Sequence, residues 1–199
     1  MADELQLTTS LVHLRPVYPS DIDSLFRLEG DPSISLRWRF AGEHPSPARY
    51  ADSLWTDIVF SFVAVDPSTG HYRGLVTTYG YDPRNAHMSF AQVMFRDGEE
   101  GSPLKAASQS IDVASLAIEY AFRGWPIRKI YIEATEPNFA QFSSMVGRVG
   151  QEEGRFRGHV FQGGTWVDLI TAAIYRDDWL SGDLSRRIVQ RSGRHDVGP

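Results

Sequence analysis

Three titratable side chains in the second half of the chain are candidates for proton transfer. His87 stands at the start of a predicted strand, and an imidazole there can take up a proton near neutral pH. Glu133 lies on a later predicted strand and Glu136 just beyond its end, so either carboxylate can act as a base, directly or through water. Because side chains alternate along a strand, Glu133 and Thr135 lie on one face and Ala134 lies on the other, so only one of these two faces can border a cleft. An exposed turn explains His87 equally well, and a residue such as Glu136 more often lies on the surface or caps a helix.

The stretch 87–122 is predicted to form a strand, a polar loop and a long helix. Residues 88–95 have the composition of a strand, and residues 96–103 hold two glycines, one proline and four charges, which indicates a loop. From Lys105 onward, apolar and polar residues separate onto two helical faces: Ile111, Ala114, Ile118 and Ala121 on one, Ser108, Asp112, Ser115 and Glu119 on the other. The first amides of a helix are unpaired and its dipole is positive there, so this arrangement is a candidate anion site.

The other elements follow from periodicity, caps and turn residues. Strands are predicted over residues 11–15, 58–65, 71–81, 88–95, 128–135, 156–161 and 166–175, and helices over residues 20–30, 46–57, 105–122 and 138–149. This order is typical of an α+β protein built around one mixed sheet. We expect a single domain over residues 1–182 and a partly disordered C-terminal tail over residues 183–199.

Composition excludes several classes of function. The chain has 199 residues, 42% of them apolar, which suffices for one substantial core. A net charge of -5 argues against nucleic acid or an anionic membrane as the main partner. There is no cysteine, and none of the six histidines pair at ligand spacing, so we expect no disulfide, no thiolate nucleophile and no metal site. Because the N-terminus lacks a signal-peptide pattern and no apolar run is long enough to span a membrane, we expect a soluble cytoplasmic protein.

Several short strings occur in a characteristic order along most of the chain. They are Leu14-Arg15-Pro16 followed by Asp21 or Asp23, Gly74, Tyr120-Ala121-Phe122, Asn138, Glu153-Gly154-Arg155, Asp168 and Trp179. Their order and spacing resemble the GNAT superfamily of acyl-CoA-dependent N-acyltransferases, and most closely the Rim-type ribosomal-protein N-terminal acetyltransferases. The resemblance implies the GNAT fold, an α+β fold with a mixed, mostly antiparallel twisted sheet of about seven strands flanked by four helices. It also implies that the fourth and fifth strands splay apart.

The same resemblance implies acetyl-CoA, or another acyl-CoA, as co-substrate, with no metal. In the family the pantetheine arm lies between the splayed strands, which assigns it to the backbone of Val93, Met94 and Phe95. The loop before the central helix wraps the pyrophosphate with backbone amides, a role that here falls to Gly101, Ser102, Lys105 and Ala106. Asn138 opens the next helix and in the family both caps it and contacts ligand.

The chain departs from the family pattern in two places. The family's pyrophosphate loop carries glycines at positions that hold Ala106 and Ser108 here, and Glu99 and Glu100 lie close by. Two carboxylates beside a pyrophosphate repel it by roughly 1 kcal/mol per close pair near the surface. Many members also use a tyrosine to protonate the leaving thiolate, and that position holds Met145, which cannot donate a proton.

Five further residues are candidates for binding the acceptor. The segment between the first two helices borders the acceptor pocket in the family, so Arg37 and Trp38 can form an anion-binding group and an aromatic wall, or simply pin a loop. Tyr79 and Tyr81 share a strand face and can line the same pocket or pack in the core. Gln92 lies in the middle of a strand, where a polar side chain needs a partner, either substrate or backbone.

Two hypotheses about function follow. The first is an N-acetyltransferase that transfers acetyl from acetyl-CoA to a primary amine of a small metabolite or of a protein N-terminus. The alternative is a GNAT-fold protein without acetyltransferase activity that serves as a ligand-binding or partner-binding module. We expect a small-molecule or peptide amine as partner and neither nucleic acid nor membrane, and a homodimer is left open.

Overall fold

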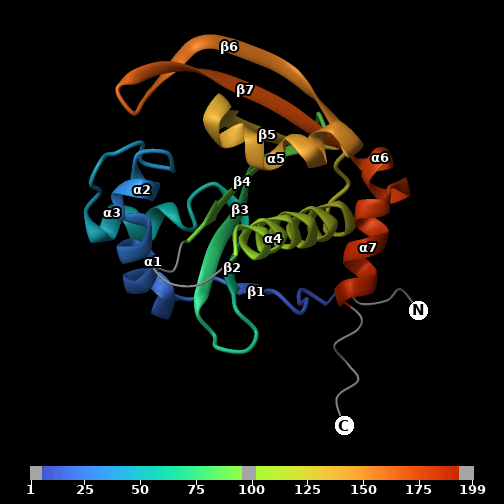
Figure 1. Cartoon of the computed structure of the whole chain (residues 1–199), viewed down its shortest axis with the longest axis horizontal. Coiled ribbons are helices and arrows are strands. Elements are labelled where there is room, and N and C mark those ends of the chain that lie inside the picture. The colour runs from blue at the N-terminus through green and yellow to red at the C-terminus, as the bar shows by residue number, and fades with distance from the viewer. Residues whose placement is uncertain (1–5, 96–101, 193–199) are drawn as a thin grey trace.

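A computed structural model describes residues 6–95 and 102–192, and these form one layered α+β arrangement around a seven-stranded sheet (Figure 1). The strands are β1 (His13–Pro16), β2 (Ile58–Val65), β3 (Tyr72–Asp82), β4 (His87–Met94), β5 (Lys129–Thr135), β6 (Gly150–Gln162) and β7 (Thr165–Tyr175). Their order in the sheet is β1-β2-β3-β4-β5-β7-β6, and only the β4–β5 pair is parallel. The predicted mixed, mostly antiparallel sheet is therefore confirmed.

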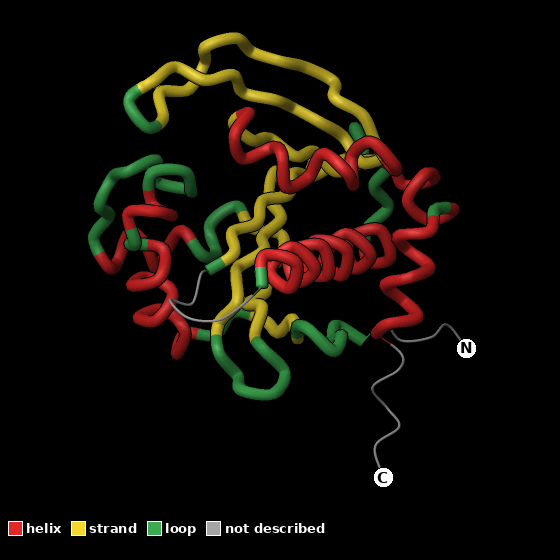
Figure 2. The backbone as a smooth tube through the Cα atoms, viewed as in Figure 1, coloured by secondary structure: helices red, strands yellow, loops and turns green. Residues whose placement is uncertain are grey.

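Helices cover both faces of this sheet. One face carries α1 (Ile22–Glu29), α2 (Pro32–Ser35) and α3 (Pro47–Ser53), and the other carries α4 (Pro103–Gly124) and α5 (Glu136–Val149). Two more helices, α6 (Arg176–Ser181) and α7 (Asp183–Ser192), follow β7. The four predicted helices correspond to α1, α3, α4 and α5, and Figure 2 shows the long β6–β7 hairpin extending over α5. Within the described residues, no helix combines the length and the apolar character that crossing a membrane requires.

Two hydrophobic clusters hold the layers together. The larger lies between the sheet and helices α4 and α5, and Phe90 and Phe122 are among its fully buried members. The smaller lies under α1, α2 and α3 and includes Leu25, Tyr50 and Val93. Since successive strand residues point to opposite faces, one strand, β4, supplies Phe90 to the first cluster and Val93 to the second. Side chains of β4 are thereby presented to both helical layers.

The central helix α4 is buried on its polar side as well as on its apolar side. Asp112 and Glu119 are 1% and 0% exposed, although periodicity assigns them to the polar face. The covering element is α7, from which Arg191 Nη1 contacts Asp112 Oδ1 at 2.6 Å and Ser185 Oγ donates to Glu119 Oε2 at 2.8 Å. Residues that we expected in a C-terminal tail thus form a packed helix, because they supply the partners that the polar face of α4 needs. The part of the expected tail after Ser192 lies outside the described residues.

A buried carboxylate, Asp21, joins the first strand to the first helical layer. Arg15 donates two hydrogen bonds to it at 2.8 Å each, and Tyr72 Oη and the backbone N–H of Tyr18 donate at 2.8 Å. The paired guanidinium of Arg15 is the main reason why the pKa of Asp21 falls from 3.8 to about 2, against the opposing effect of burial. This contact ties β1 and β3 to the start of α1, and so positions the layer that covers one side of the sheet.

Replacing Asp21 with Asn is expected to lower the free energy of unfolding by about 2 kcal/mol at pH 7. The folded-state pKa of Asp21 lies below its ordinary value, so its contribution is complete above about pH 4 and is lost as the pH falls toward 2. Urea titrations of both proteins between pH 7 and pH 2 should therefore show a difference that narrows with acid. Asp23→Asn, an exposed neighbour, is the control, and a pH-independent difference for Asp21→Asn would contradict the assignment.

Gly74 allows β3 and β4 to approach closely. A Cβ atom at this position would lie 2.5 Å from the carbonyl oxygen of Val93 and 2.9 Å from Sδ of Met94. No side chain fits there without displacing the backbone of β4. The contact sets the position of the part of β4 that borders the candidate site.

Candidate active site

The β4 and β5 strands separate halfway along their length. Their pairing ends at Phe90 and Ile132, whereas β4 continues to Met94 and β5 continues to Thr135. Beyond that point β4 stays paired with β3, and β5 stays paired with β7. Across the opening, the facing edges of β4 and β5 form no hydrogen bonds with each other. The backbone groups on these edges can therefore bind a ligand. This is the splay that the GNAT resemblance implies.

A cavity of about 1260 Å³ occupies this opening and reaches both helical layers. On one side its walls are the first turns of α4 and α5 with Thr135, the N-cap of α5, and on the other side they are the segment after α2 together with β3 and Glu133 of β5. Phe90 and Phe142 form an edge-to-face pair in the wall, with ring centroids 6.2 Å apart. We call the α4–α5 side the cofactor side and the α2–β3 side the acceptor side.

On the cofactor side the structure brings together most of the residues predicted to hold an acyl-CoA. The residues of this group that line the cavity are Val93, Met94, Phe95, Lys105, Ala106 and Asn138, with the side chains of Val93 and Phe95 packed in the smaller cluster under α1, α2 and α3. Ser102 is the N-cap of α4, and its Oγ accepts the backbone N–H of Lys105 at 3.2 Å. The exposed N-terminus of α4 faces the cavity, so its dipole and the ammonium group of Lys105 suit a phosphate group. Gly101, with Glu99 and Glu100, lies outside the described residues.

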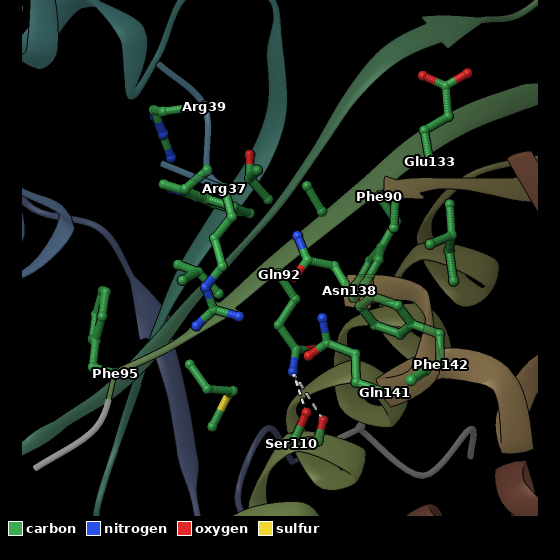
Figure 3. A pocket seen from close by; sticks show the side chains of 18 of the residues that line it. Arg37, Arg39, Phe90, Gln92, Phe95, Ser110, Glu133, Asn138, Gln141 and Phe142 are labelled. Atoms are coloured by element: carbon green, nitrogen blue, oxygen red, sulfur yellow. Dashed lines mark hydrogen bonds between the residues drawn. The ribbon is translucent and has the colours of Figure 1, made fainter. Parts of the chain in front are cut away.

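Side-chain amides converge on the same side. Gln92, for which substrate or a backbone group was the expected partner, lines the cavity, and its Nε2 donates to Ser110 O at 3.1 Å and to Ser110 Oγ at 2.9 Å on α4. Figure 3 shows Gln92, Asn138 and Gln141 pointing into the cavity. Asn138 is not the N-cap of α5, because Thr135 holds that position. Sequence reasoning missed Ser110 and Gln141, although Gln141 lies three residues after Asn138 and therefore on the same helical face.

Two buried oxygen atoms test whether this side fits pantetheine. Gln92 Oε1 and Thr135 Oγ1 are buried and have no hydrogen-bond partner within the described part of the chain, and both residues line the cavity. A buried acceptor without a donor costs about 1–3 kcal/mol, so such an atom normally accepts a hydrogen bond from a ligand or from water. Pantetheine carries two amide N–H groups and matches this need. The residues present therefore fit an acyl-CoA.

On the acceptor side, Glu133 and Tyr79 share the cavity wall. Glu133 Oε1 accepts a hydrogen bond from Thr171 Oγ1 at 3.4 Å (Figure 3 shows the carboxylate of Glu133). Burial, and then the negative charge of Glu133, raise the pKa of Tyr79 above its ordinary value. The Tyr79 phenol thus stays protonated at neutral pH and can donate a hydrogen bond, whereas Glu133 is a carboxylate that can accept a proton.

The segment after α2 forms the opposite wall and is held by a buried carboxylate. Arg37, Trp38 and Arg39 line the cavity. Glu29, 5% exposed, accepts hydrogen bonds from Trp38 Nε1 and Tyr50 Oη at 2.7 Å each, and Arg39 Nε lies 3.1 Å from it. Burial raises the pKa of Glu29, and the charge of Arg39 opposes that rise. The predicted aromatic wall is thus fixed by its own hydrogen bonds.

His87 lies outside the cavity. It starts β4 at the end that is paired with β5, opposite to the opening. Its Nε2 is 3.8 Å from Asp82 Oδ2, and its ring packs edge-on against Tyr131 with centroids 5.2 Å apart. The geometry therefore does not support His87 as the base. Within the described residues, no group of three or more His, Asp or Glu side chains is arranged to hold a metal ion.

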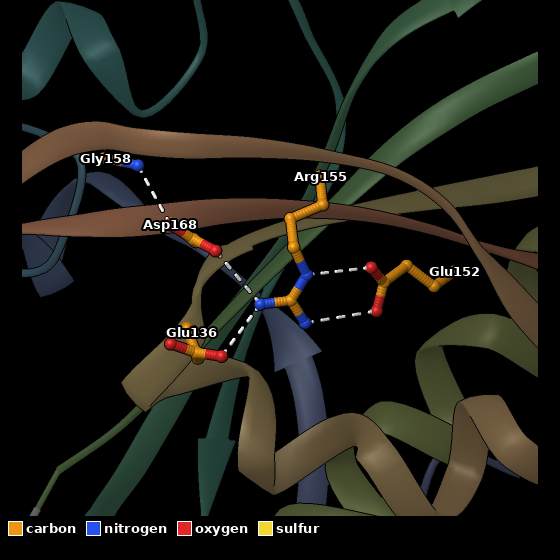
Figure 4. A network of polar contacts seen from close by, with 5 residues as sticks. All are labelled: Glu136, Glu152, Arg155, Gly158 and Asp168. Carbon is orange, nitrogen blue, oxygen red and sulfur yellow. Dashed lines mark hydrogen bonds and ion pairs between the residues drawn. The ribbon is translucent and has the colours of Figure 1, made fainter.

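Glu136 is also separated from the cavity, because it belongs to an ion-pair network (Figure 4). Arg155 Nη1 contacts Glu136 Oε1 at 2.7 Å and Asp168 Oδ2 at 3.2 Å, and Arg155 Nε contacts Glu152 Oε1 at 3.1 Å. Asp168 Oδ1 also accepts the backbone N–H of Gly158 at 2.9 Å. The network joins the start of α5 to the β6–β7 hairpin and holds the carboxylate of Glu136 outside the cavity wall.

Tyr81 does not share a face with Tyr79. The register between β3 and β4 shifts between Tyr79 and Asp82, and Gly80 adopts a φ of 60°. The irregularity breaks the alternation of side chains, so Tyr81 packs against the core under α4 while Tyr79 lines the cavity. A glycine in a strand pattern is the sequence signal that could have indicated this change.

Comparisons with known proteins support the fold. No protein-family model matches the sequence, and no curated protein matches it. Among solved structures, spermidine N-acetyltransferase from Vibrio cholerae in complex with CoA and spermine is 18% identical, with a TM-score of 0.69 over 86% of this chain and 99% of that chain. A chimera of the Vibrio cholerae enzyme with hSSAT is 16% identical, with a TM-score of 0.69 over 87% of this chain and 100% of that chain. At these identities the likeness shows that the chain has the GNAT acyltransferase fold.

Proposed function

We propose that the protein is an N-acetyltransferase that transfers the acetyl group of acetyl-CoA to a primary amine of a small metabolite. The observation that carries this proposal is the cavity in the opening between β4 and β5, with the N-terminus of α4 on one side and Glu133 on the other. An acyl donor and an amine acceptor can then approach the opening from the two opposite helical layers.

The cofactor side supplies the binding groups for the donor. The N-terminus of α4 and Lys105 bind phosphate. Gln92 Oε1 and Thr135 Oγ1 accept hydrogen bonds from the amide N–H groups of pantetheine. When bound, acetyl-CoA supplies the thioester that is the acetyl donor. Backbone N–H groups at the open edge of β4 can donate to the thioester carbonyl oxygen and stabilise the negative charge that develops on it.

The acceptor side prepares the amine. An alkylammonium ion carries no lone pair, so it must lose a proton before it can attack a carbonyl carbon. Glu133 takes that proton, directly or through a water, and holds it at a carboxylate oxygen. The phenol of Tyr79 orients the amine by donating a hydrogen bond, because its raised pKa keeps it protonated. Positioning the amine beside the opening supplies the remaining part of the rate acceleration.

One observation favours a second candidate, a GNAT-fold protein that binds a ligand or partner without transferring acetyl. Met145 stands where many members of the superfamily have the tyrosine that protonates the thiolate, and it is 5% exposed within the main core. The chain therefore offers no proton donor at that position. In this case the same cavity would hold a ligand without catalysing transfer.

A thermal shift assay combined with a thiol-release assay tests the proposal. Acetyl-CoA should raise Tm in a concentration-dependent manner, because a ligand at about 100 times its Kd stabilises the folded state by about 2.7 kcal/mol. ATP, which lacks pantetheine, is the control and should stabilise less. Free thiol should then be released when primary amines are added. Stabilisation without thiol release over a broad amine panel would favour the binding module, and no stabilisation by acetyl-CoA would contradict both the donor site and the enzyme.

An activity on protein N-termini, the oligomeric state and the location in the cell stay predictions. A Rim-type activity on protein N-termini would be detected by including peptides with free N-termini in the amine panel. A homodimer is tested by light scattering, and the expected cytoplasmic location is tested by fractionation of cells.

A further inference from the structure

Four apolar side chains of the β6–β7 hairpin lie on one face of the sheet. They are Phe156 and Val160 of β6 and Val167 and Leu169 of β7, and we call them the hairpin strip. Residues that pair across antiparallel strands share a face, and the register pairs Phe156 with Leu169 and, nearer the turn, the two valines with each other. Within the described residues, none of the four belongs to a hydrophobic cluster or packs against one, and Phe156 is 53% exposed. Packing of the core therefore does not account for the strip.

The hairpin strip continues from the acceptor side of the cavity. Glu133 pairs with Thr171, and alternation along β7 places Thr171 on the same face as Leu169, which itself lines the cavity. Phe156 lies two strands and two residues from Glu133, which corresponds to about 12 Å along the sheet. In Figure 1 the hairpin extends past the end of β5, toward the side of the molecule that carries α2 and α3. A molecule with its amine at Glu133 can therefore reach the strip with the rest of its length.

Aromatic rings contribute to the opposite wall of the acceptor side. Trp38 and Phe40 line the cavity and pack against the smaller hydrophobic cluster. The polar atom of Trp38 is already used, because its Nε1 donates to Glu29 at 2.7 Å. Arg39, beside it, is held by Glu29 at 3.1 Å and donates to Ser53 O at 3.2 Å. Trp38 and Phe40 thus offer ring surfaces to a ligand, and ring surfaces favour apolar groups.

The positions of the carboxylate and of the apolar surfaces define the class of acceptor. Among the described residues that line the cavity, Glu133 is the only carboxylate, so it locates the ammonium group. We infer that the acceptor is a primary amine with an extended apolar group, alkyl or arylalkyl, that packs between Trp38 and the hairpin strip; this inference rests on the proposed acetyltransferase function. Each methylene removed from water there strengthens binding. A polyamine is disfavoured, because its further ammonium groups would be desolvated against apolar side chains.

A series of amines of increasing length tests the inference on the wild-type protein. Ethylamine, n-butylamine, n-hexylamine and n-octylamine differ only in methylenes, 2-phenylethylamine carries a ring, and spermidine carries further charges on a chain of similar length to octylamine. Because the strip leaves one side of the chain in water, kcat/KM is expected to rise about twofold per methylene, and so about 60-fold from ethylamine to octylamine. Octylamine should exceed spermidine by about tenfold or more. Comparison of 2-phenylethylamine with n-hexylamine distinguishes a preference for a ring from one for a chain.

Two variants of the strip and a matched control connect the preference to these side chains. Phe156→Ser is expected to lower the ratio of kcat/KM for octylamine to that for ethylamine about fivefold, and Leu169→Ala tests the end of the strip that lines the cavity. Phe161→Ser is the control, because Phe161 is an exposed aromatic residue of the same strand. Its ring packs against Trp166 at 5.4 Å on the opposite face of the hairpin, so this variant should keep the ratio.

The outcomes separate the inference from the proposed function. If kcat/KM does not change with chain length, or if spermidine is acetylated as efficiently as octylamine, the inference is wrong and the acetyltransferase stands. If Phe156→Ser and Leu169→Ala both keep the ratio, or if Phe161→Ser lowers it as much as Phe156→Ser does, the strip does not bind the acceptor and the inference is again wrong. If acetyl-CoA acetylates no amine of the series or of the broader panel, the proposed function has failed and the inference fails with it.

Discussion

Replacing Glu133 with Gln is expected to lower kcat for amine acetylation by about 10²- to 10⁴-fold at neutral pH. Glutamine keeps the shape of the side chain and can still accept the hydrogen bond from Thr171, but it takes no proton from an ammonium group. Since Glu133 lies on the acceptor side, the affinity for acetyl-CoA should not change. The loss should also shrink at high pH, where more of the amine is already deprotonated in solution.

Steady-state kinetics from pH 6 to pH 10 and a thermal shift with acetyl-CoA measure these effects. Glu136→Gln is the matched control, because it makes the same chemical change three residues away at a carboxylate engaged with Arg155 outside the cavity. Its kcat should stay within about twofold of the wild-type value. If Glu133→Gln keeps its activity while Glu136→Gln loses it, the base has been assigned to the wrong carboxylate.

Replacing Glu119 with Gln is expected to lower the free energy of unfolding by about 3–5 kcal/mol. The Glu119 carboxylate is fully buried and accepts hydrogen bonds from Trp179 Nε1 at 2.7 Å, Ser185 Oγ at 2.8 Å and Arg123 Nε at 2.8 Å. An amide at this position turns one acceptor into a donor that faces other donors, and removes the charge that balances Arg123. The hydrogen bonds of Trp179 in α6 and Ser185 in α7 to α4 would be disturbed, while the ion pair of Arg191 with Asp112 would remain.

Urea unfolding followed by circular dichroism measures this loss, and limited proteolysis reports whether the C-terminal helices detach first. Glu43→Gln is the control, because Glu43 forms an ion pair with Arg49 in which both side chains are more than half exposed. Removing that pair should cost less than about 1 kcal/mol. Equal losses in the two variants would mean that the buried carboxylate does not hold the C-terminal helices.

Much of the fold could be predicted because it depends on local patterns. The apolar run of β5, the helical period of α4 and the Gly-Gly turn of the β6–β7 hairpin each identify their element without knowledge of the rest of the chain. Much of the cavity wall also follows, since Val93, Glu133 and Trp38 lie on segments that this element order brings to the opening. For such residues, the order of the elements along the chain and the alternation of side chains along a strand suffice to predict a position in the cavity wall.

Other parts of the site depend on how strands align with their neighbours. His87 and Val93 belong to the same strand, yet only Val93 borders the cavity, because β5 diverges after Phe90. Tyr81 turns away from Tyr79 because the strand is irregular between Tyr79 and Asp82. A shift in register moves a side chain to the other face of a sheet, and it is determined by pairing that periodicity does not describe.

Local sequence patterns predict the strands and helices α1, α3, α4 and α5, and they identify side chains that can bind phosphate, accept a proton or attract an anion. The tertiary fold alone brings particular members of that set together. It placed Glu133 in the cavity and Glu136 in the Arg155 network, although the two are three residues apart. It also covered the polar face of α4 with α7, because Asp112 and Glu119 can be buried only where distant residues donate hydrogen bonds to them. Local sequence sets the periodicity of apolar residues in an element, whereas the burial of a side chain and its hydrogen-bond partners depend on contacts between residues far apart in the chain.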